Sequence, residues 1–377
     1  MILRHGVWLL LLPLLAGCSS GSTPAGQEPA ELASYRSTAK IAVRWQYDYL
    51  NEGGRGGLQP AVTQDGVFVA SARGELMRLD RANGNRLWQI NSGFNISGAV
   101  GAGDGLVLVG GEKGDLAAYE IDGRLRWKTR VSSEVLSAPQ VANGMVIVRT
   151  GDGRIAALSA QDGKRQWLYE RPTPALVVRS HSGVRIQRGI VYAGFAAGKL
   201  AALNINNGAV IWESAVSQPR GTTELERISD ITSLPEVDDE QVCAVAFQGR
   251  LSCFDIAQGA TLWSRDVSSD KGMTLLRKFI YVTDANGAVL ALDKSSGSSL
   301  WKNDQLYMRG VTAPAVLGDY VLVGDYKGYV HAMNREDGRL VARTRTENSP
   351  ILFAPALLDD GVMVQTRGGG VYSLAIH

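Results

Sequence analysis

The histidine, cysteine and acidic residues of this chain form no recognisable catalytic or metal-binding pattern. Four histidines are present: His5 near the N-terminus, His181 in an expected loop, His331 in an expected strand and His377 at the end. Their spacing matches no zinc site. No cluster of acidic residues indicates a calcium site, and the G-x-S-x-G pattern around a nucleophilic serine is absent. We therefore expect no catalytic residue, no metal and no cofactor.

The first of the three cysteines follows a short apolar run. Arg4 supplies a positive charge, Val7 to Leu15 is apolar, and the sequence Leu-Ala-Gly-Cys ends at Cys18. The run is too short to cross a bilayer, so it is typical of a secretory signal. The last four residues resemble the bacterial lipobox. This resemblance implies that residues 1–17 are a signal peptide and that Cys18 carries acyl chains, including palmitate, as a membrane anchor. The alternative is a plain signal followed by an incidental cysteine.

The residues after Cys18 indicate the destination of the chain and a linker. By the sorting rule of lipoproteins, Ser19 in place of Asp implies the outer membrane, with the protein on its periplasmic face. Residues 18–40 are rich in Ser, Pro, Ala and Gly. We expect them to form a flexible tether.

The other two cysteines, Cys243 and Cys253, lie in two apolar runs joined at "FQG". The hairpin expected there would place them nearly opposite each other on adjacent strands. The periplasm is oxidising, but direct cross-strand disulfides are geometrically demanding. A disulfide bond and a pair of buried thiols therefore both remain open.

The composition indicates a folded protein with many turns. Hydrophobic residues make up 45% of the 377 residues, 44 residues are glycine, and the formal net charge is +2. This content of apolar residues argues against general disorder. The low net charge argues against a broad basic surface for nucleic acid.

A repeat of about 40 residues organises the chain. Tryptophans mark seven copies, and a glycine stands four residues before the Trp position in the last seven frames, including "NREDGRLVA", where Ala342 replaces the Trp. The seven are Trp45, Trp88, Trp127, Trp167, Trp212, Trp263 and Trp301. Each period contains four short apolar runs separated by Gly- and Asn-rich turns, which indicates four β-strands. We expect the tryptophans to pack at the joints between neighbouring units.

Four strands in a period of this length predict the blade of a β-propeller. The last copy has only three strand-like runs, and the missing fourth is found at the N-terminus in "IAVRWQYDY". The predicted fold is thus all-β: an eight-bladed β-propeller of four-stranded antiparallel blades over residues 41–377. The N-terminal strand completes the last blade and covers edges that would otherwise be exposed.

Two insertions interrupt the repeat on neighbouring blades, over Arg171 to Gly183 and Ser217 to Ser233. Both link the last strand of one blade to the first strand of the next, so we expect them to project from the same face of the disc. The first contains Leu176, Val177 and Val178 followed by Arg179, and apolar residues beside an arginine are typical of a protein-binding hot spot. The second contains Asp230. The alternatives are that the first loop folds inward and that Asp230 caps a turn.

The repeat "x-A-L-D-x-x-x-G-x-x-x-W" resembles that of pyrroloquinoline quinone dehydrogenases. The whole chain, with lipobox, tether, eight repeats and two insertions, resembles the BamB family of lipoproteins of the β-barrel assembly machinery. That resemblance implies a non-catalytic scaffold that binds the POTRA domains of BamA, assists outer-membrane proteins and could contact them as they fold.

In that family an L-x-L-R loop and an S-D-x-D loop contact BamA. The first motif corresponds to Leu176, Val178 and Arg179, with Val in place of the second Leu. The second corresponds to Asp230, with Thr232 in place of an acidic residue. The alternative functions are a quinoprotein dehydrogenase and a periplasmic propeller that binds another protein.

Overall fold

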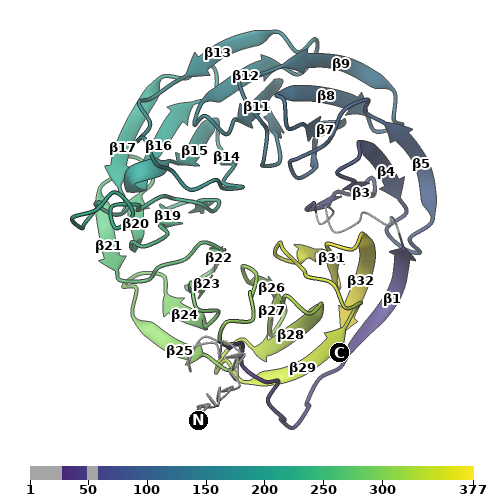
Figure 1. Ribbon diagram of the computed structural model, residues 1–377, viewed down its shortest axis with the longest axis vertical. Helices are drawn as coiled ribbons and strands as arrows, with labels where there is room; N and C mark the ends of the chain where they lie inside the picture. The colour runs from purple at the N-terminus through teal and green to yellow at the C-terminus, as the bar shows by residue number, and fades with distance from the viewer. Residues whose placement is uncertain (1–27, 49–57) are drawn as a thin grey trace, which may run out of the picture.

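The computed structural model describes residues 28–48 and 58–377. Their strands form eight four-stranded antiparallel sheets, which stand around a central axis as the blades of a propeller (Figure 1). The expected fold class is confirmed.

The strands of blades 1 to 4 are β2 (Ala61–Val62), β3 (Val67–Ala70), β4 (Glu75–Leu79), β5 (Arg86–Asn91); β6 (Gly101–Gly103), β7 (Leu106–Gly110), β8 (Asp115–Glu120), β9 (Leu125–Arg130); β10 (Gln140–Ala142), β11 (Met145–Arg149), β12 (Ile155–Ser159), β13 (Arg165–Tyr169); β14 (Val184–Gln187), β15 (Ile190–Gly194), β16 (Lys199–Asn204) and β17 (Val210–Ala215). The strands of blades 5 to 8 are β18 (Glu236–Val237), β19 (Gln241–Val245), β20 (Leu251–Asp255), β21 (Thr261–Arg265); β22 (Gly272–Leu276), β23 (Phe279–Thr283), β24 (Val289–Asp293), β25 (Ser299–Asn303); β26 (Ala315–Leu317), β27 (Tyr320–Gly324), β28 (Tyr329–Asn334), β29 (Leu340–Arg345); β30 (Ala356–Leu357), β31 (Val362–Gln365), β32 (Gly370–Ile376) and β1 (Ile41–Asp48). One 3-10 turn, η1 (Ala196–Gly198), joins β15 to β16.

The position of a strand within its blade explains its residue pattern. All five residues of β7 are buried, because neighbouring blades cover both faces of an inner strand. In the outer strand β9 most residues are exposed, and Trp127 is the one that is buried. The outer strands therefore combine polar residues with one large apolar residue that points toward the next blade.

The eighth blade is closed by the two ends of the chain, as predicted. Strand β1 pairs antiparallel with β32, from Ile41 opposite Ile376 to Asp48 opposite Gly370. This pairing covers the edge of β32 and joins the first described strand to the last one.

Each tryptophan of the repeat links its blade to the following one. The Nε1–H of Trp212 donates to the carbonyl oxygen of Ile256 at 3.1 Å. The other six pairs are Trp45–Arg81, Trp88–Ile121, Trp127–Ala160, Trp167–Ile205, Trp263–Lys294 and Trp301–Arg335. The expected role of the tryptophans at the joints is confirmed.

The repeated glycine has a second function besides its turn. Gly259 has a φ of +69°, and a Cβ at this position would lie 2.5 Å from Cδ2 of Trp212. All seven glycines lie in the left-handed region, and a Cβ would come within 2.4 to 3.2 Å of the preceding blade's indole. The positive φ is the turn geometry that the sequence predicts. The close approach of the indole depends on the neighbouring blade.

The same contact explains why position 342 is alanine. A tryptophan there would dock on the turn before the outer strand of blade 8, but that strand is β1, so the residue before β1 and the C-terminal residue occupy the place of the turn. Lys40 N–H donates to the carbonyl of His377 at 2.8 Å, and His377 N–H donates back at 3.0 Å. No turn is present to receive an indole.

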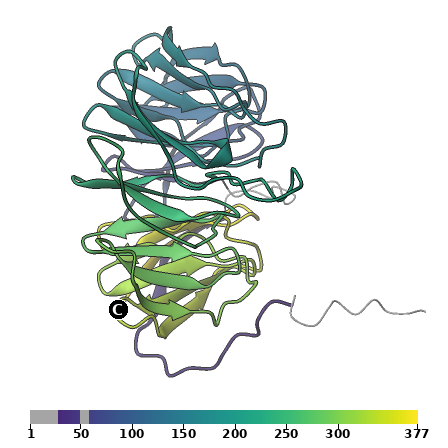
Figure 2. The same ribbon diagram turned by 90° about the vertical axis from the view of Figure 1, so that its left-hand side faces the viewer.

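The residues before β1 are attached to the propeller. Arg309 Nη1 donates to the carbonyl of Ala30 at 2.9 Å, and Thr38 N–H donates to the carbonyl of Val341 at 3.1 Å. In Figure 2 residues 28–40 run from the face that carries the C-terminus to the opposite face of the disc.

The structure bears on only part of the expected N-terminal organisation. The second half of the expected tether lies against blades 6 and 7. The signal peptide, residues 1–17, and Cys18 lie outside the described residues. Among the residues that the structure does describe, no helix is long and apolar enough to cross a membrane.

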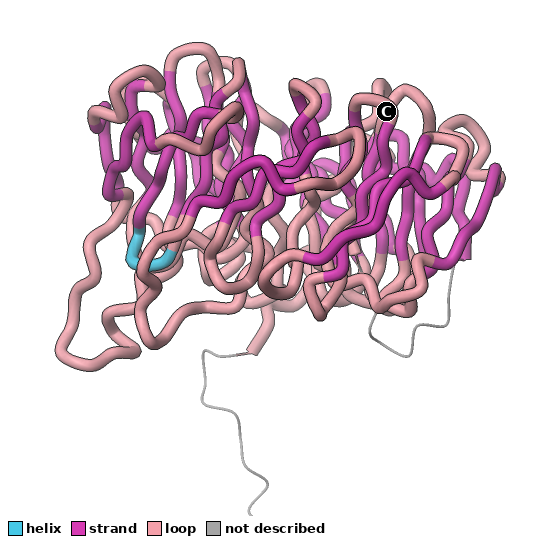
Figure 3. The backbone as a smooth tube through the Cα atoms, turned by 90° about the horizontal axis from the view of Figure 1, so that it is seen from above, coloured by secondary structure: helices cyan, strands magenta, loops and turns pink. Residues whose placement is uncertain are grey.

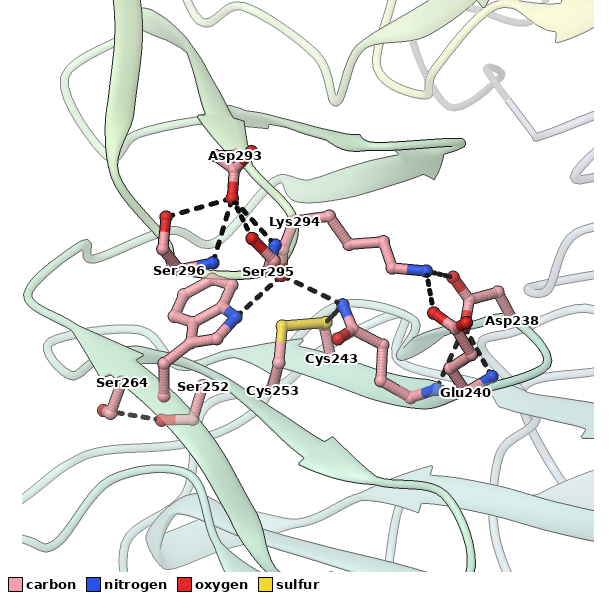
Figure 4. The surroundings of a disulfide bond; sticks show 12 residues. Asp238, Glu240, Cys243, Ser252, Cys253, Ser264, Asp293, Lys294, Ser295 and Ser296 are labelled. Atoms are coloured by element: carbon pink, nitrogen blue, oxygen red, sulfur yellow. Dashed lines mark hydrogen bonds and ion pairs between the residues drawn. A yellow bond between two sulfur atoms is a disulfide. The ribbon is translucent and has the colours of Figure 1, made fainter.

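Cys243 and Cys253 form a disulfide bond between β19 and β20, at directly opposed positions of the two strands. Both residues are fully buried. Gln241 Nε2 donates to the carbonyl of Lys294 at 3.3 Å in the next blade, so the bond lies in a packed joint between blades 5 and 6 (Figure 4).

Candidate functional site

The two insertions lie on the same face of the disc. They connect β13 to β14 and β17 to β18. Figure 3 shows long loops projecting beyond η1 on one face, whereas the C-terminus lies at the opposite face. The N-terminal segment, residues 28–40, also leads toward the face with the long loops (Figure 2). The expectation that both insertions project from one face of neighbouring blades is met.

Asp230 connects the two insertions. Its Oδ2 accepts a hydrogen bond from Val178 N–H at 2.8 Å, and its Oδ1 accepts one from Ala197 N–H at 3.0 Å. Ala197 has a φ of +58°, a conformation that is unfavourable for a residue with a Cβ. Asp230, which we expected to project toward a partner, is instead only 4% exposed. It holds the first insertion and η1 in place.

The first insertion then presents apolar and cationic side chains to solvent. Leu176 is 42% exposed and Val177 is 40% exposed. Val178 is half-buried and Arg179 is exposed. Within the described part of the chain, Arg179 forms no hydrogen bond or ion pair. Leu176, Val177 and Arg179 are thus available to a partner.

Thr232 follows Asp230 into the interior. It is 7% exposed, and its Oγ1 has no hydrogen-bond partner among the described residues. It makes no direct contribution to the exposed surface.

A cavity of about 230 Å³ opens beside the first insertion, lined by Val177, Val178, Arg179 and Asp230. Two further arginines, Arg149 and Arg171, also line it, and both lie on the ring of Phe195, with Cζ 5.4 Å and 5.1 Å from its centroid. Burial lowers the pKa of Arg149 to about 10, although the charge of Asp230 partly opposes this effect. Arg149 is therefore still charged at neutral pH.

Arg149, Arg171 and Phe195 were not among the residues predicted from the sequence. A signal was available for Arg149, which lies four residues before the glycine of the turn between the second and third strands of its blade. It is the only charged residue at this position in the eight repeats. Arg171 and Phe195 carry no such signal, since only the packing of blades 3 and 4 brings them together.

The first insertion also reaches across the central axis. His181, in the link between blades 3 and 4, lies edge-on to Phe353, in the link between blades 7 and 8, with ring centroids 5.3 Å apart. These links are on opposite sides of an eight-membered ring, so the two side chains bridge the channel. In the described residues no group of three or more His, Cys, Asp or Glu side chains could hold a metal ion. The residues here do not fit the quinone and calcium of dehydrogenases with this repeat.

Comparison with known proteins identifies close relatives. The family profile described as outer membrane protein assembly factor BamB matches residues 72–303 and 308–377. The protein of that name from Nitrosomonas eutropha is 42% identical over an alignment of 385 residues, which covers 98% of this chain and 94% of the relative. The one from Bordetella pertussis is 36% identical and covers 98% of this chain and 96% of the relative.

Solved structures show the same fold. The crystal structure of BamB from Moraxella catarrhalis has a TM-score of 0.82 at 28% identity, covering 89% of this chain and 99% of that one. Quinohemoprotein alcohol dehydrogenase from Comamonas testosteroni has a TM-score of 0.71 at 13% identity, covering 89% of this chain and 76% of that one. At that identity the dehydrogenase shares the fold alone.

Proposed function

Because this chain belongs to the BamB family of outer membrane protein assembly factors, we propose that it is a scaffold of the β-barrel assembly machinery and that its insertion face binds the POTRA domains of BamA. The observation that supports this function most is the arrangement of the two insertions. They lie on neighbouring blades, a buried carboxylate of the second insertion fixes the first one, and the first insertion exposes Leu176, Val177 and Arg179 together.

The exposed residues and Asp230 have different parts in this proposal. Leu176 and Arg179 contact the partner, because an aliphatic side chain beside an unpaired guanidinium can both bury apolar area and donate to carboxylates or carbonyls. Asp230 acts through Val178, since its oxygens are occupied within the chain. Val178 contributes by its position in the loop more than by its half-buried side chain.

We also propose that the protein has no catalytic activity. The bridge between His181 and Phe353 occupies the axis, where related propellers hold their quinone. Addition of pyrroloquinoline quinone and calcium should therefore produce no bound-quinone absorbance. Such an absorbance at stoichiometric occupancy would favour the dehydrogenase alternative.

The proposed anchor at Cys18 agrees with the path of the N-terminal segment. Residues 28–40 lead toward the face that bears the insertions. A chain of about ten residues between Cys18 and this segment has a mean reach of roughly 18 Å if it is a flexible coil. A lipid at Cys18 would keep the insertion face near the outer membrane, where a partner anchored in that membrane would meet it.

The test is a titration of isolated POTRA domains against purified variants of this protein. We expect Arg179→Ala and Leu176→Ala to weaken binding, by up to about thirtyfold for a hot spot of about 2 kcal/mol. Arg86→Ala is the matched control, because Arg86 is an exposed arginine on β5 of blade 1. Equal affinities for the wild type, Arg179→Ala and Leu176→Ala would reject this face as the binding site.

A further inference from the structure

Blade 3 differs from the other blades at one position near the insertion face. Four residues before the glycine of the turn between its second and third strands, blade 3 carries Arg149. The equivalent residues of the other blades are Ala70, Gly110, Gly194, Val245, Thr283, Gly324 and Gln365. A charged residue therefore stands where the other repeats have small, aliphatic or neutral ones.

In several blades this position is closed by an apolar contact. A Cβ at Gly110 would lie 2.4 Å from Val135, and one at Gly194 would lie 2.2 Å from Ile231. Both aliphatic residues belong to the link that follows the blade, so the link packs directly on the glycine. Blade 3 has Arg149 in place of the glycine, and the cavity of about 230 Å³ lies there.

Arg149 has no carboxylate partner in the described structure. Its Nη1 donates to the carbonyl of Ser182 at 3.1 Å, and its guanidinium lies on Phe195. Asp230, the acid whose charge acts on Arg149, directs both oxygens to backbone N–H groups. Glu134 also lines the cavity, but it accepts a hydrogen bond from Ser133 and forms no ion pair with Arg149.

The neighbouring arginine shows what Arg149 lacks. Arg171 lines the same cavity and also lies on the ring of Phe195, and its Nη1 forms an ion pair with Glu213 at 3.1 Å. A partly buried cation without such a partner loses hydration that no direct ion pair replaces. The cavity is therefore suited to an anion supplied from outside.

We propose that this cavity receives a carboxylate side chain of the protein partner and that Arg149 binds it. The inference rests on the proposed function, since it assumes that the insertion face meets BamA. A guanidinium can donate two parallel hydrogen bonds to a carboxylate, which fixes its orientation as well as its charge. The volume exceeds the roughly 30 Å³ share of one water molecule severalfold, so an Asp or Glu side chain fits. Arg179, at the rim, would then guide the acidic side chain inward.

The first test compares two variants of the cavity in binding to the POTRA domains. Arg149→Gln should bind at least tenfold more weakly than the wild type, and Arg149→Lys should retain part of the affinity. Arg171→Gln is the matched control, with a smaller expected loss, because Glu213 already satisfies Arg171. The melting temperature of Arg149→Gln should be unchanged or higher, since the substitution removes an unpaired charge.

The second test identifies the acid. Each Asp and Glu of the POTRA domains is changed to its amide and titrated against both the wild type and Arg149→Gln. For one acid, the change to its amide should weaken binding to the wild type but not to Arg149→Gln. This result is the signature of a direct pair. Wild-type affinity in Arg149→Gln would overturn the proposal. A loss of affinity in Arg149→Gln that adds to the effect of every acid-to-amide change in the partner would overturn it too. Failure of the wild type itself to bind would instead refute the proposed function, and the cavity's assignment to this partner with it.

Discussion

Replacing Asp230 by Ala should weaken partner binding even though Asp230 is buried. Its carboxylate accepts the N–H groups of Val178 and Ala197, and hydrogen bonds to a charged group contribute about 1.5–3 kcal/mol each. Losing the bond to Val178, at about 2 kcal/mol, would shift the equilibrium of the first insertion about thirtyfold toward conformations detached from Asp230. The residues that follow, including Arg179, would then no longer be held in one position.

Hydrogen exchange at the backbone amides distinguishes this mechanism from a direct contact. In Asp230→Ala the amides of Val178 and Ala197 should exchange about thirtyfold faster or more, because local opening no longer breaks a charged hydrogen bond. In Arg179→Ala these amides should exchange at the wild-type rate, although binding is also weakened. The second variant is therefore the control for the first.

In Asp230→Ala, partner affinity and amide exchange must change together. Weaker binding by Asp230→Ala with unchanged exchange at Val178 would mean that Asp230 touches the partner directly. Faster exchange with wild-type affinity would mean that the position of this loop does not matter for binding. Either result would refute the positioning role.

Three further predictions concern the scaffold. Gly259→Ala should destabilise the protein by at least 1 kcal/mol more than Gly144→Ala in chemical denaturation. Both glycines have a similar positive φ, but a Cβ at Gly259 would meet an indole, whereas one at Gly144 would have nothing within 4 Å. Equal losses of stability in the two variants would reject the contact. Replacing both Cys243 and Cys253 by Ala should lower the free energy of unfolding by up to about 3 kcal/mol and abolish the effect of a reducing agent on the melting temperature. If a reducing agent left the melting temperature of the wild type unchanged, the bond would not be stabilising. Burial is the main cause that lowers the pKa of His331, so below about pH 6.5 the unfolded chain takes up a proton that the folded chain does not. Stability should therefore fall as the pH is lowered from 7 to 5, and this slope should be shallower in His331→Gln; identical slopes would assign the effect to other groups.

The sequence alone determined the architecture, since a repeat states the same local information many times. Turn residues, four short apolar runs and Trp with Gly four residues earlier recur at a nearly constant interval, and only a closed ring of similar blades gives each copy the same neighbours. The incomplete last copy and the extra strand around Trp45 were enough to predict how the ring closes. The sequence also indicated where the repeat is interrupted, and so located Leu176, Arg179 and Asp230 on one face.

The tertiary structure decided what these residues do. Asp230 is a buried anchor for Val178 because a segment 52 residues away in sequence packs against it, and Arg149 lacks an ion partner because the acids around it are engaged elsewhere. The open choice between a disulfide and two thiols was settled by the structure, in which Cys243 and Cys253 are bonded at directly opposed positions of β19 and β20. Local sequence pattern specifies strands and turns, whereas burial and hydrogen-bond partners depend on which distant segments meet after folding, and no short-range pattern contains that information.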